Sequence, residues 1–366
     1  MYEHQGLQDM FFVMLYGGAA MMALLAALYL LLRRANALFP DVDSPRELRF
    51  CAAAFLLAVA ASHIWWYVLG IHWLTDDRLL RNIIAITLDR ITFVPLMMCF
   101  LLRMLQHQRY PYWPIAVSMV PFVAIAIVSI VTRCDVFECY IEAYSVLLCV
   151  VFFTYYVYAL RQYGHWLRDN YADLEHKEVW QSLVLITCIL LAYVVYTTNE
   201  GVLATEYLAQ LLTLVIIVFI VWRVESLSKL PPSTDTQIQK TNDDSFVDET
   251  EHLMDSLLRE HCEHPKLYLL HNLSLTQLAV AIGTNRTYLS SYFTNKGETY
   301  NGYINRLRIA HFCHLYRQAV ANKRPFTALE LAQQSGYRSY STFSFAFKQL
   351  TGQKVSEWMR SQEMKP

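Results

Sequence analysis

Apolar residues fill most of the chain up to residue 224 and are less frequent after it. Seven apolar stretches lie in this first part, each close to the roughly 20 residues that a helix needs to cross a bilayer. They cover residues 10–32, 50–69, 83–102, 113–131, 144–160, 182–198 and 203–222. The first ends in Arg33 and Arg34 rather than a small-residue cleavage site, so we expect a retained span and not a signal peptide. The pattern predicts an all-α bundle of seven transmembrane helices over residues 1–224.

Positive charges divide unequally between the two sets of loops that join these stretches. One set holds eleven Lys and Arg residues, whereas the opposite set holds only Arg78, Arg81 and Arg133. Because cytoplasmic loops are the ones enriched in Lys and Arg, the excess predicts an N-terminus outside and a C-terminal tail in the cytoplasm. An odd number of spans requires the same arrangement.

Rows of small residues spaced four apart occur in the first two stretches. They are Ala19, Ala23 and Ala27 in one, and Ala54, Ala58 and Ser62 in the other. Such rows let helix backbones approach closely in lipid. They favour ordinary packing of two helices of one chain, with a homodimer interface as the alternative that stays open.

A few polar side chains lie inside the apolar stretches. His63 in the second stretch and Asp89-Arg90 in the third are about six residues from the outer ends, which at ~1.5 Å per residue is roughly 9–10 Å deep. A charge in mid-bilayer costs on the order of 3 kcal/mol, so these groups should face the bundle interior or water. We expect Asp89 to meet His63 on the neighbouring antiparallel helix, at a level shared by Trp66 and Glu206.

Three interpretations of this polar cluster stay open. The groups can form a structural ion pair beneath an aromatic belt, which locks the helices together. They can instead line a sensing pocket for an external or membrane ligand, or conduct protons or ions. The pocket interpretation takes in His63, Trp66, Asp89, Arg90 and Glu206.

The sequence contains no HExxH, GxSxG or Walker pattern and no CxxC pair. We therefore expect no enzyme activity, no cofactor and no metal site. Cys134 and Cys139 flank a short loop on the outer side, where the compartment permits disulfides. A small cross-link between them can form there, although so short a loop gains little stability from it.

The composition changes abruptly at residues 225–248, where two prolines precede runs of Ser, Thr, Asn and Asp. So little can be buried there that a flexible linker is predicted. Residues 249–366 then return to a helical pattern. They carry a net charge of +5 against −6 for the rest of the chain, which is compatible with a nucleic-acid partner.

Two helix-turn-helix patterns follow within this last region. In the first, Ser274 caps a helix, Gly283 forms the corner and a second helix starts at Arg286; the second has its corner at Gly336, 53 residues later. Glycine suits both corners because it adopts positive φ without steric cost. A long helix over about residues 299–320 joins them. Two units on one rigid helix can place two recognition helices in successive major-groove segments, about 34 Å apart.

The residues of the second pattern match a known signature more closely than a helix-turn-helix spacing alone would. Residues 336–352 (GYRSYSTFSFAFKQLTG) and 356–360 (SEWMR) resemble the signature of AraC-type transcription regulators, and residues 303–308 (YINRLR) are similar to the start of that family's linker helix. The resemblance covers roughly the last 110 residues. Most members of the family carry a soluble ligand-binding domain where this chain has apolar stretches, so the fusion looks like the membrane-anchored members.

The resemblance implies which side chains meet DNA. The first recognition helix would present Arg286, Thr287, Ser290 and Ser291, and the second Tyr340, Ser341, Thr342 and Phe345. Phe345 stands where the family often has a polar or basic reader, so it would touch a thymine methyl group. With few Arg or Gln readers, much of the affinity should come from phosphate contacts. The candidates for these are Lys296, Arg306, Arg338 and Lys348.

Together these features predict a multi-pass regulator of the bacterial inner (cytoplasmic) membrane. Its domains would be the membrane bundle over 1–224, the linker over 225–248 and an AraC-type DNA-binding domain over 249–366. The expected partners are promoter DNA, RNA polymerase, membrane lipid and an external or membrane ligand. The alternative is a membrane transporter or anchor protein with an appended DNA-binding module.

Overall fold

The computed structural model describes residues 7–33, 35–70, 77–133, 138–197, 203–230 and 247–363. Every regular element in these ranges is a helix, and the β pairing among them is one isolated bridge, so the predicted all-α class is confirmed. The chain divides into two compact units. The first comprises Met1–Tyr163 and His176–Ser233, and the second comprises Gly164–Glu175 and Thr234–Pro366.

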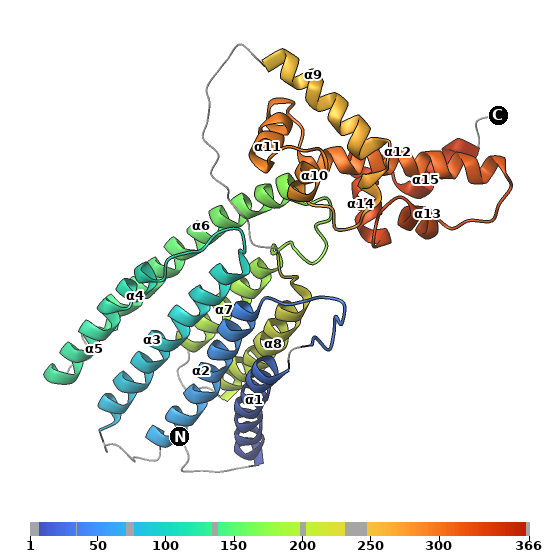
Figure 1. Ribbon diagram of the computed structural model, residues 1–366. Coiled ribbons are helices and arrows are strands. Elements are labelled where there is room, and N and C mark those ends of the chain that lie inside the picture. The colour runs from blue at the N-terminus through green and yellow to red at the C-terminus, as the bar shows by residue number, and fades with distance from the viewer. Residues whose placement is uncertain are drawn as a thin grey trace. The chain divides into compact units, whose positions relative to one another are not determined.

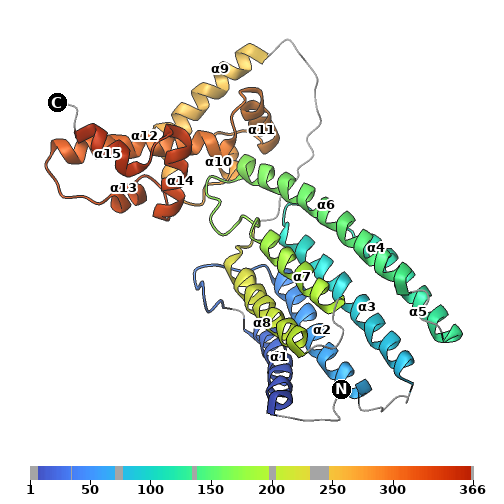
Figure 2. The same cartoon turned by 180° about the vertical axis from the view of Figure 1, so that it is seen from behind.

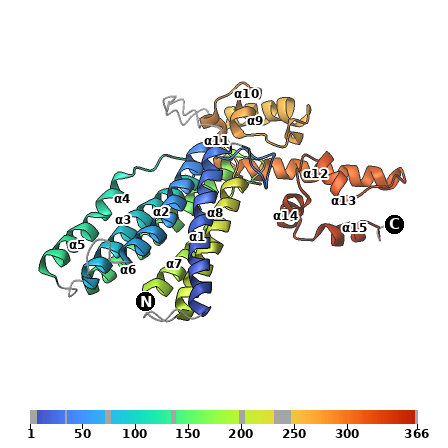
Figure 3. The same cartoon turned by 90° about the horizontal axis from the view of Figure 1, so that it is seen from below.

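The first unit is a bundle of long apolar helices. Its core pairs α1 (Leu7–Leu32) with α2 (Arg46–Gly70) and α8 (Leu203–Ser226), as Figures 1 and 3 show. Next to these, α3 (Arg78–Met104) packs on α2, and α7 (Ser182–Thr197) packs on α8. On the other side of α3 lie α4 (Trp113–Ser118), α5 (Val120–Thr132) and the long α6 (Glu138–Asn170).

Six helical stretches of the described residues are long and apolar enough to cross a membrane. They coincide with six of the seven predicted spans. The remaining one corresponds to α7, of which the structure describes 16 residues, fewer than a span needs. The seventh span therefore stays a prediction.

Two of the spans differ in detail from their prediction. The stretch predicted at 113–131 consists of two helices, α4 and α5, separated at Met119. Pro121 accounts for the break, because its ring clashes with the carbonyl of Val117 and it has no N–H to donate. The stretch predicted at 144–160 is the middle of α6, which continues as an unbroken helix to Asn170.

The small residues of α1 are packed inside the bundle. Ala19, Ala23 and Ala27 have no exposed surface, and Ala58 and Ser62 of α2 are nearly as well covered. Ala54, the remaining member of the second row, is half-buried. Since α1 packs directly on α2, the five covered residues lie in the packing of neighbouring helices of one chain.

The second unit is organised along one long helix, α12 (Tyr300–Ala321). At one end lie α9 (Val247–Leu258), a π-helical turn (Arg259–Glu263), α10 (Leu275–Ala281) and α11 (Arg286–Asn295), as Figure 2 shows. At the other end lie α13 (Ala328–Gln334), α14 (Tyr340–Thr351) and α15 (Val355–Glu363). Each end has its own apolar core, one around Leu278, Leu289 and Ile304 and the other around Phe312, Phe343 and Phe347.

Local sequence fixes where these short helices begin. Ser274 and Thr327 form reciprocal capping boxes with Gln277 and Glu330 at the starts of α10 and α13. Such a pair satisfies two backbone donors that the helix itself cannot bond. Both predicted glycine corners are confirmed, with φ of 75° at Gly283 and 90° at Gly336.

A buried arginine joins the two ends of this unit. Arg308 of α12 is 1% exposed and donates to the carbonyls of Tyr268 and Leu270, both at 2.7 Å. Its guanidinium also lies 5.5 Å from the ring centre of Tyr337, next to the Gly336 corner of the second helix-turn-helix. His271 bonds the carbonyl of Gly336 at 3.0 Å. A buried guanidinium that donates hydrogen bonds on one side and lies over an aromatic ring on the other fixes the relative position of the two.

Candidate nucleic-acid interface

The first helix that could read DNA is α11. Its start is capped by Asn285, whose side chain accepts from the Tyr288 amide at 2.7 Å. Leu289, Tyr292 and Phe293 point into the core, and this helical spacing leaves the opposite face free. On that face Thr287 and Ser291 are exposed, whereas Arg286 and Ser290 are half-buried.

The second is α14, which begins at the cap Ser339. Phe343, Ala346 and Phe347 are buried, so Tyr340, Ser341 and Phe345 are left on the exposed face and Thr342 is half-buried. Phe345 is 73% exposed, so its ring is open to contact at the surface of α14. An exposed ring on a recognition helix suits apolar contact with a thymine methyl group.

The arrangement of two helix-turn-helix units along one helix agrees with a comparison of the chain with known protein families. Residues 278–361 match the family model described as a helix-turn-helix domain. This region is an AraC-type helix-turn-helix domain. Searches of curated proteins and of solved structures find no match to the chain. The matched residues contribute to both apolar cores, one at each end of α12.

Two of the four predicted phosphate-binding cations are engaged within the AraC-type domain and its preceding helix. Lys296 donates to both carboxylate oxygens of Asp255 on α9, at 2.6 and 2.8 Å. Burial raises the pKa of Asp255, but hydrogen bonds from Lys296 and Tyr292 outweigh it and hold that pKa below its usual value. Arg306 binds both carboxylate oxygens of Glu298 at 3.1 Å. Each pair must open, or share its cation, before that cation can contact a phosphate.

The other two cations are available. Arg338 and Lys348 are exposed, and within residues 247–363 neither forms an ion pair. Arg338 lies just before α14 and Lys348 in its last turn, so they flank the exposed face of that helix. Of the four candidates, these two are the ones placed to meet phosphates without rearrangement.

The sequence did not reveal that two of the residues predicted to read DNA have partners in residues 164–175. Arg286 donates through Nε to the side-chain oxygen of Asn170 at 2.9 Å. The Thr342 hydroxyl lies 3.3 Å from a carboxylate oxygen of Glu175, to which it donates. Both partners belong to the second unit.

Asp89 lies in a dense polar cluster of the first unit. It is 6% exposed and accepts hydrogen bonds from Ser62 at 2.7 Å, from the Trp65 indole at 3.1 Å and from the Trp66 indole at 2.7 Å. Three donors around one carboxylate satisfy its oxygen atoms, which accounts for an acid buried between apolar helices. The neighbouring Arg90 is half-buried.

His63 has a different set of partners from the one expected. Its ring bonds the Val59 carbonyl at 2.8 Å and Gln210 of α8 at 3.0 Å, and it packs 4.5 Å from the ring of Tyr16. Glu206 lies one turn before Gln210 on α8 and is half-buried. The structure therefore links α2 to α3 through Asp89, and α2 to α8 through His63.

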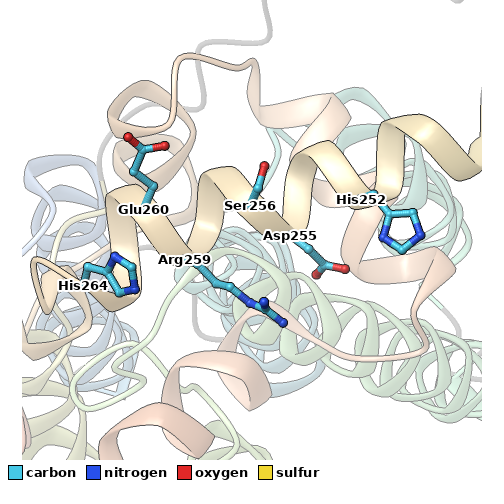
Figure 4. A pocket seen from close by; sticks show the side chains of 6 residues that line it. All are labelled: His252, Asp255, Ser256, Arg259, Glu260 and His264. Atoms are coloured by element: carbon cyan, nitrogen blue, oxygen red, sulfur yellow. The ribbon is translucent and has the colours of Figure 1, made fainter.

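The remaining chemistry-bearing groups give no further site. Cys134 lies outside the described residues and Cys139 is an exposed free thiol, so the cross-link stays a prediction. Within the described residues no group of His, Cys, Asp and Glu side chains could hold a metal ion. A shallow pocket follows α9 and the π-helical turn (Figure 4). Its polar lining includes Asp255, which already binds Lys296, and its two histidines lie at opposite ends.

Proposed function

We propose that the chain is a transcription regulator held in the bacterial inner membrane, with an AraC-type domain that binds promoter DNA in the cytoplasm. The observation that carries this proposal is one polypeptide that joins six membrane-length apolar helices to an AraC-type helix-turn-helix domain. A DNA-binding domain of this type acts where DNA and RNA polymerase are, and the Lys and Arg excess of the loops supports the same orientation.

Two measurements test this function. Reporter fusions after Arg161 should be retained in the cytoplasm, whereas fusions after Arg133 should be exported; the reverse pattern would overturn the orientation. Transcript profiling of a deletion strain should reveal genes whose levels return when the full chain is restored. A full chain with Thr287→Ala and Ser341→Ala should accumulate normally and fail to restore them. If that variant restores them fully, the assigned reading face is wrong.

We propose further that the membrane unit senses a signal through the cluster around Asp89. Support comes from a buried carboxylate of α3 with three donors on α2, two of which are half-exposed indole groups. Intramembrane acids are costly and are usually retained for a role. A ligand or proton that competes for the carboxylate would release Trp65 and Trp66 and so alter the packing of α2 on α3.

The variant Asp89→Asn separates sensing from helix locking. If the cluster senses, the variant should reach normal abundance and bind DNA normally, while transcription of the target genes changes. If the cluster only locks helices, abundance should fall and the surviving protein should signal normally. Immunoblots beside a promoter reporter distinguish the two, and normal abundance with normal signalling would remove Asp89 from both accounts.

A further inference from the structure

A short segment before α7 is built into the DNA-binding unit. Residues 164–175 are grouped with it rather than with the other helices. Ala172 is 2% exposed inside the core of the first helix-turn-helix, and its amide donates to the Leu273 carbonyl at 3.2 Å. Tyr171 forms an antiparallel bridge with Ser274, the cap of α10. The segment therefore docks by backbone pairing and by burial, as a folded part of the unit.

Side chains of α12 hold the same segment from the other side. Asn301 donates to the carbonyls of Tyr171 at 3.0 Å and Ala172 at 2.8 Å. Asp173 is 6% exposed, and its charge acts on Arg308, the residue that joins the two ends of the unit. The docking position is thus specified by two side-chain hydrogen bonds from α12.

The ends of the segment meet the side chains assigned to DNA reading. The side-chain oxygen of Asn170 accepts a hydrogen bond from Nε of Arg286, the first residue of α11. The carboxylate of Glu175 accepts one from the hydroxyl of Thr342, in the first turn of α14. Six residues of chain therefore reach both recognition helices, and they use the donors that a DNA base or phosphate would require.

Charge makes the two ligands exclusive. The segment carries three acids, Asp169, Asp173 and Glu175, against one arginine, Arg168, and DNA presents a dense row of negative phosphates. Like charges at one surface repel each other, and a donor held by Asn170 or Glu175 cannot serve DNA at the same time. The segment therefore has the same sign of charge as the DNA that it would exclude.

We infer that residues 164–175 are an intramolecular competitor of DNA, which covers Arg286 and Thr342 in an inhibited state and leaves them when the regulator is active. The inference rests on the proposed DNA-binding function. Residues 164–170 continue α6 without a break, and α6 contains a candidate membrane span. A displacement of that span moves the segment through a continuous helix, which gives the membrane unit a means to release the recognition helices.

A reversible lock tests the competition. Paired residues of an antiparallel bridge have Cα atoms about 4.5–5.5 Å apart, within the range of about 4.4–6.8 Å that a disulfide spans. The full chain with Tyr171→Cys and Ser274→Cys is placed in lipid nanodiscs and titrated with a pool of short DNA duplexes with a randomised centre. Oxidation should lower affinity for the pool by tenfold or more, and reduction of the same sample should restore it. The single variant Tyr171→Cys, treated identically, controls for the other cysteines.

A release variant tests the opposite direction. Glu175→Ala removes the acceptor of Thr342 and should raise affinity for the same pool about three- to tenfold, the effect of one lost competing hydrogen bond. Glu357→Ala of α15 makes the same charge change away from the segment and should leave affinity within twofold. If oxidised and reduced locks bind equally, or if both acid variants behave alike, the competition is refuted. If the released variant Glu175→Ala, the reduced lock and the unaltered chain all fail to bind any duplex, the proposed function itself is wrong.

Discussion

Replacing Gly336 with alanine should damage the AraC-type domain far more than the same change at Gly283. Both glycines form the corner of a helix-turn-helix unit, and both have a positive φ that an L-residue adopts at a cost of roughly 1–2 kcal/mol. They differ in the space around them. A Cβ on Gly283 would meet nothing within 4 Å, whereas one on Gly336 would lie 2.9 Å from the Cα and carbonyl oxygen of Leu269.

The backbone of Leu269 cannot move aside cheaply. Its neighbours Tyr268 and Leu270 supply the carbonyls that hold the buried Arg308, and a Cβ at residue 336 would also come 3.1 Å from Nε of that arginine. Overpacking a tight core costs about 1–3 kcal/mol. We therefore expect Gly283→Ala to lower the free energy of unfolding of the domain by about 1–2 kcal/mol, and Gly336→Ala by about 2–5 kcal/mol.

Hydrogen–deuterium exchange of the full chain measures this difference, because peptides from α10 to α15 report the opening of the domain separately from the membrane helices. In Gly336→Ala, the amides of α12 to α14 should lose the most protection. Equal losses in the two variants would refute the reasoning, since they would show that the close approach to Leu269 carries no energy beyond the cost of the positive φ.

Arg338→Ala should weaken binding to all duplexes and reduce the salt slope by about 1, because one phosphate contact is lost; an unchanged slope in a salt titration would dismiss this contact. Thr287→Ala should instead alter the preference among sequences recovered from a randomised pool, with little change in salt slope. Asp255 has a lowered pKa in the folded chain, so its contribution is present above the unfolded pKa near about 3.9 and is lost as pH falls through the folded value. Asp255→Asn should therefore reduce the drop in stability of the domain below about pH 4, measured by hydrogen exchange. The change should be less than about 1 kcal/mol because the pair with Lys296 is partly exposed. If the variant and the unaltered chain lose stability equally with acid, the pair makes no contribution.

Local signals in the sequence were enough to place most of the helices. Ser274, Gly283 and Gly336 act within a few residues of themselves, as a cap and as two corners, so their roles can be read without any tertiary information. The break before Pro121 has the same local character, and the clash of its ring with the preceding turn could have been predicted.

Contacts between distant residues could not be predicted in the same way. Lys296 lies 41 residues from Asp255 and Arg286 lies 116 residues from Asn170, and nothing in either local sequence indicates the pairing. For this reason the sequence presents Lys296 as a free phosphate ligand and gives no sign that residues 164–175 dock on the domain. Asp89 shows the same limit of prediction for a side chain within the membrane bundle. Its depth was evident, but the choice of Ser62 and two indoles as donors depends on helix rotation, which hydropathy does not determine.

The buried Arg308 has a consequence for the promoters that such a regulator can use. Because it ties the turn at Tyr268 to the corner at Tyr337, it holds the two predicted recognition helices at a fixed distance and angle from each other. A binding site must then carry its two sub-sites about one helical turn of DNA apart, roughly 10 base pairs. Adding about half a turn between them would place one sub-site on the far side of the double helix, beyond the reach of a rigid protein. Mutations that change sub-site spacing should therefore be rarer in its target promoters than mutations that change the bases.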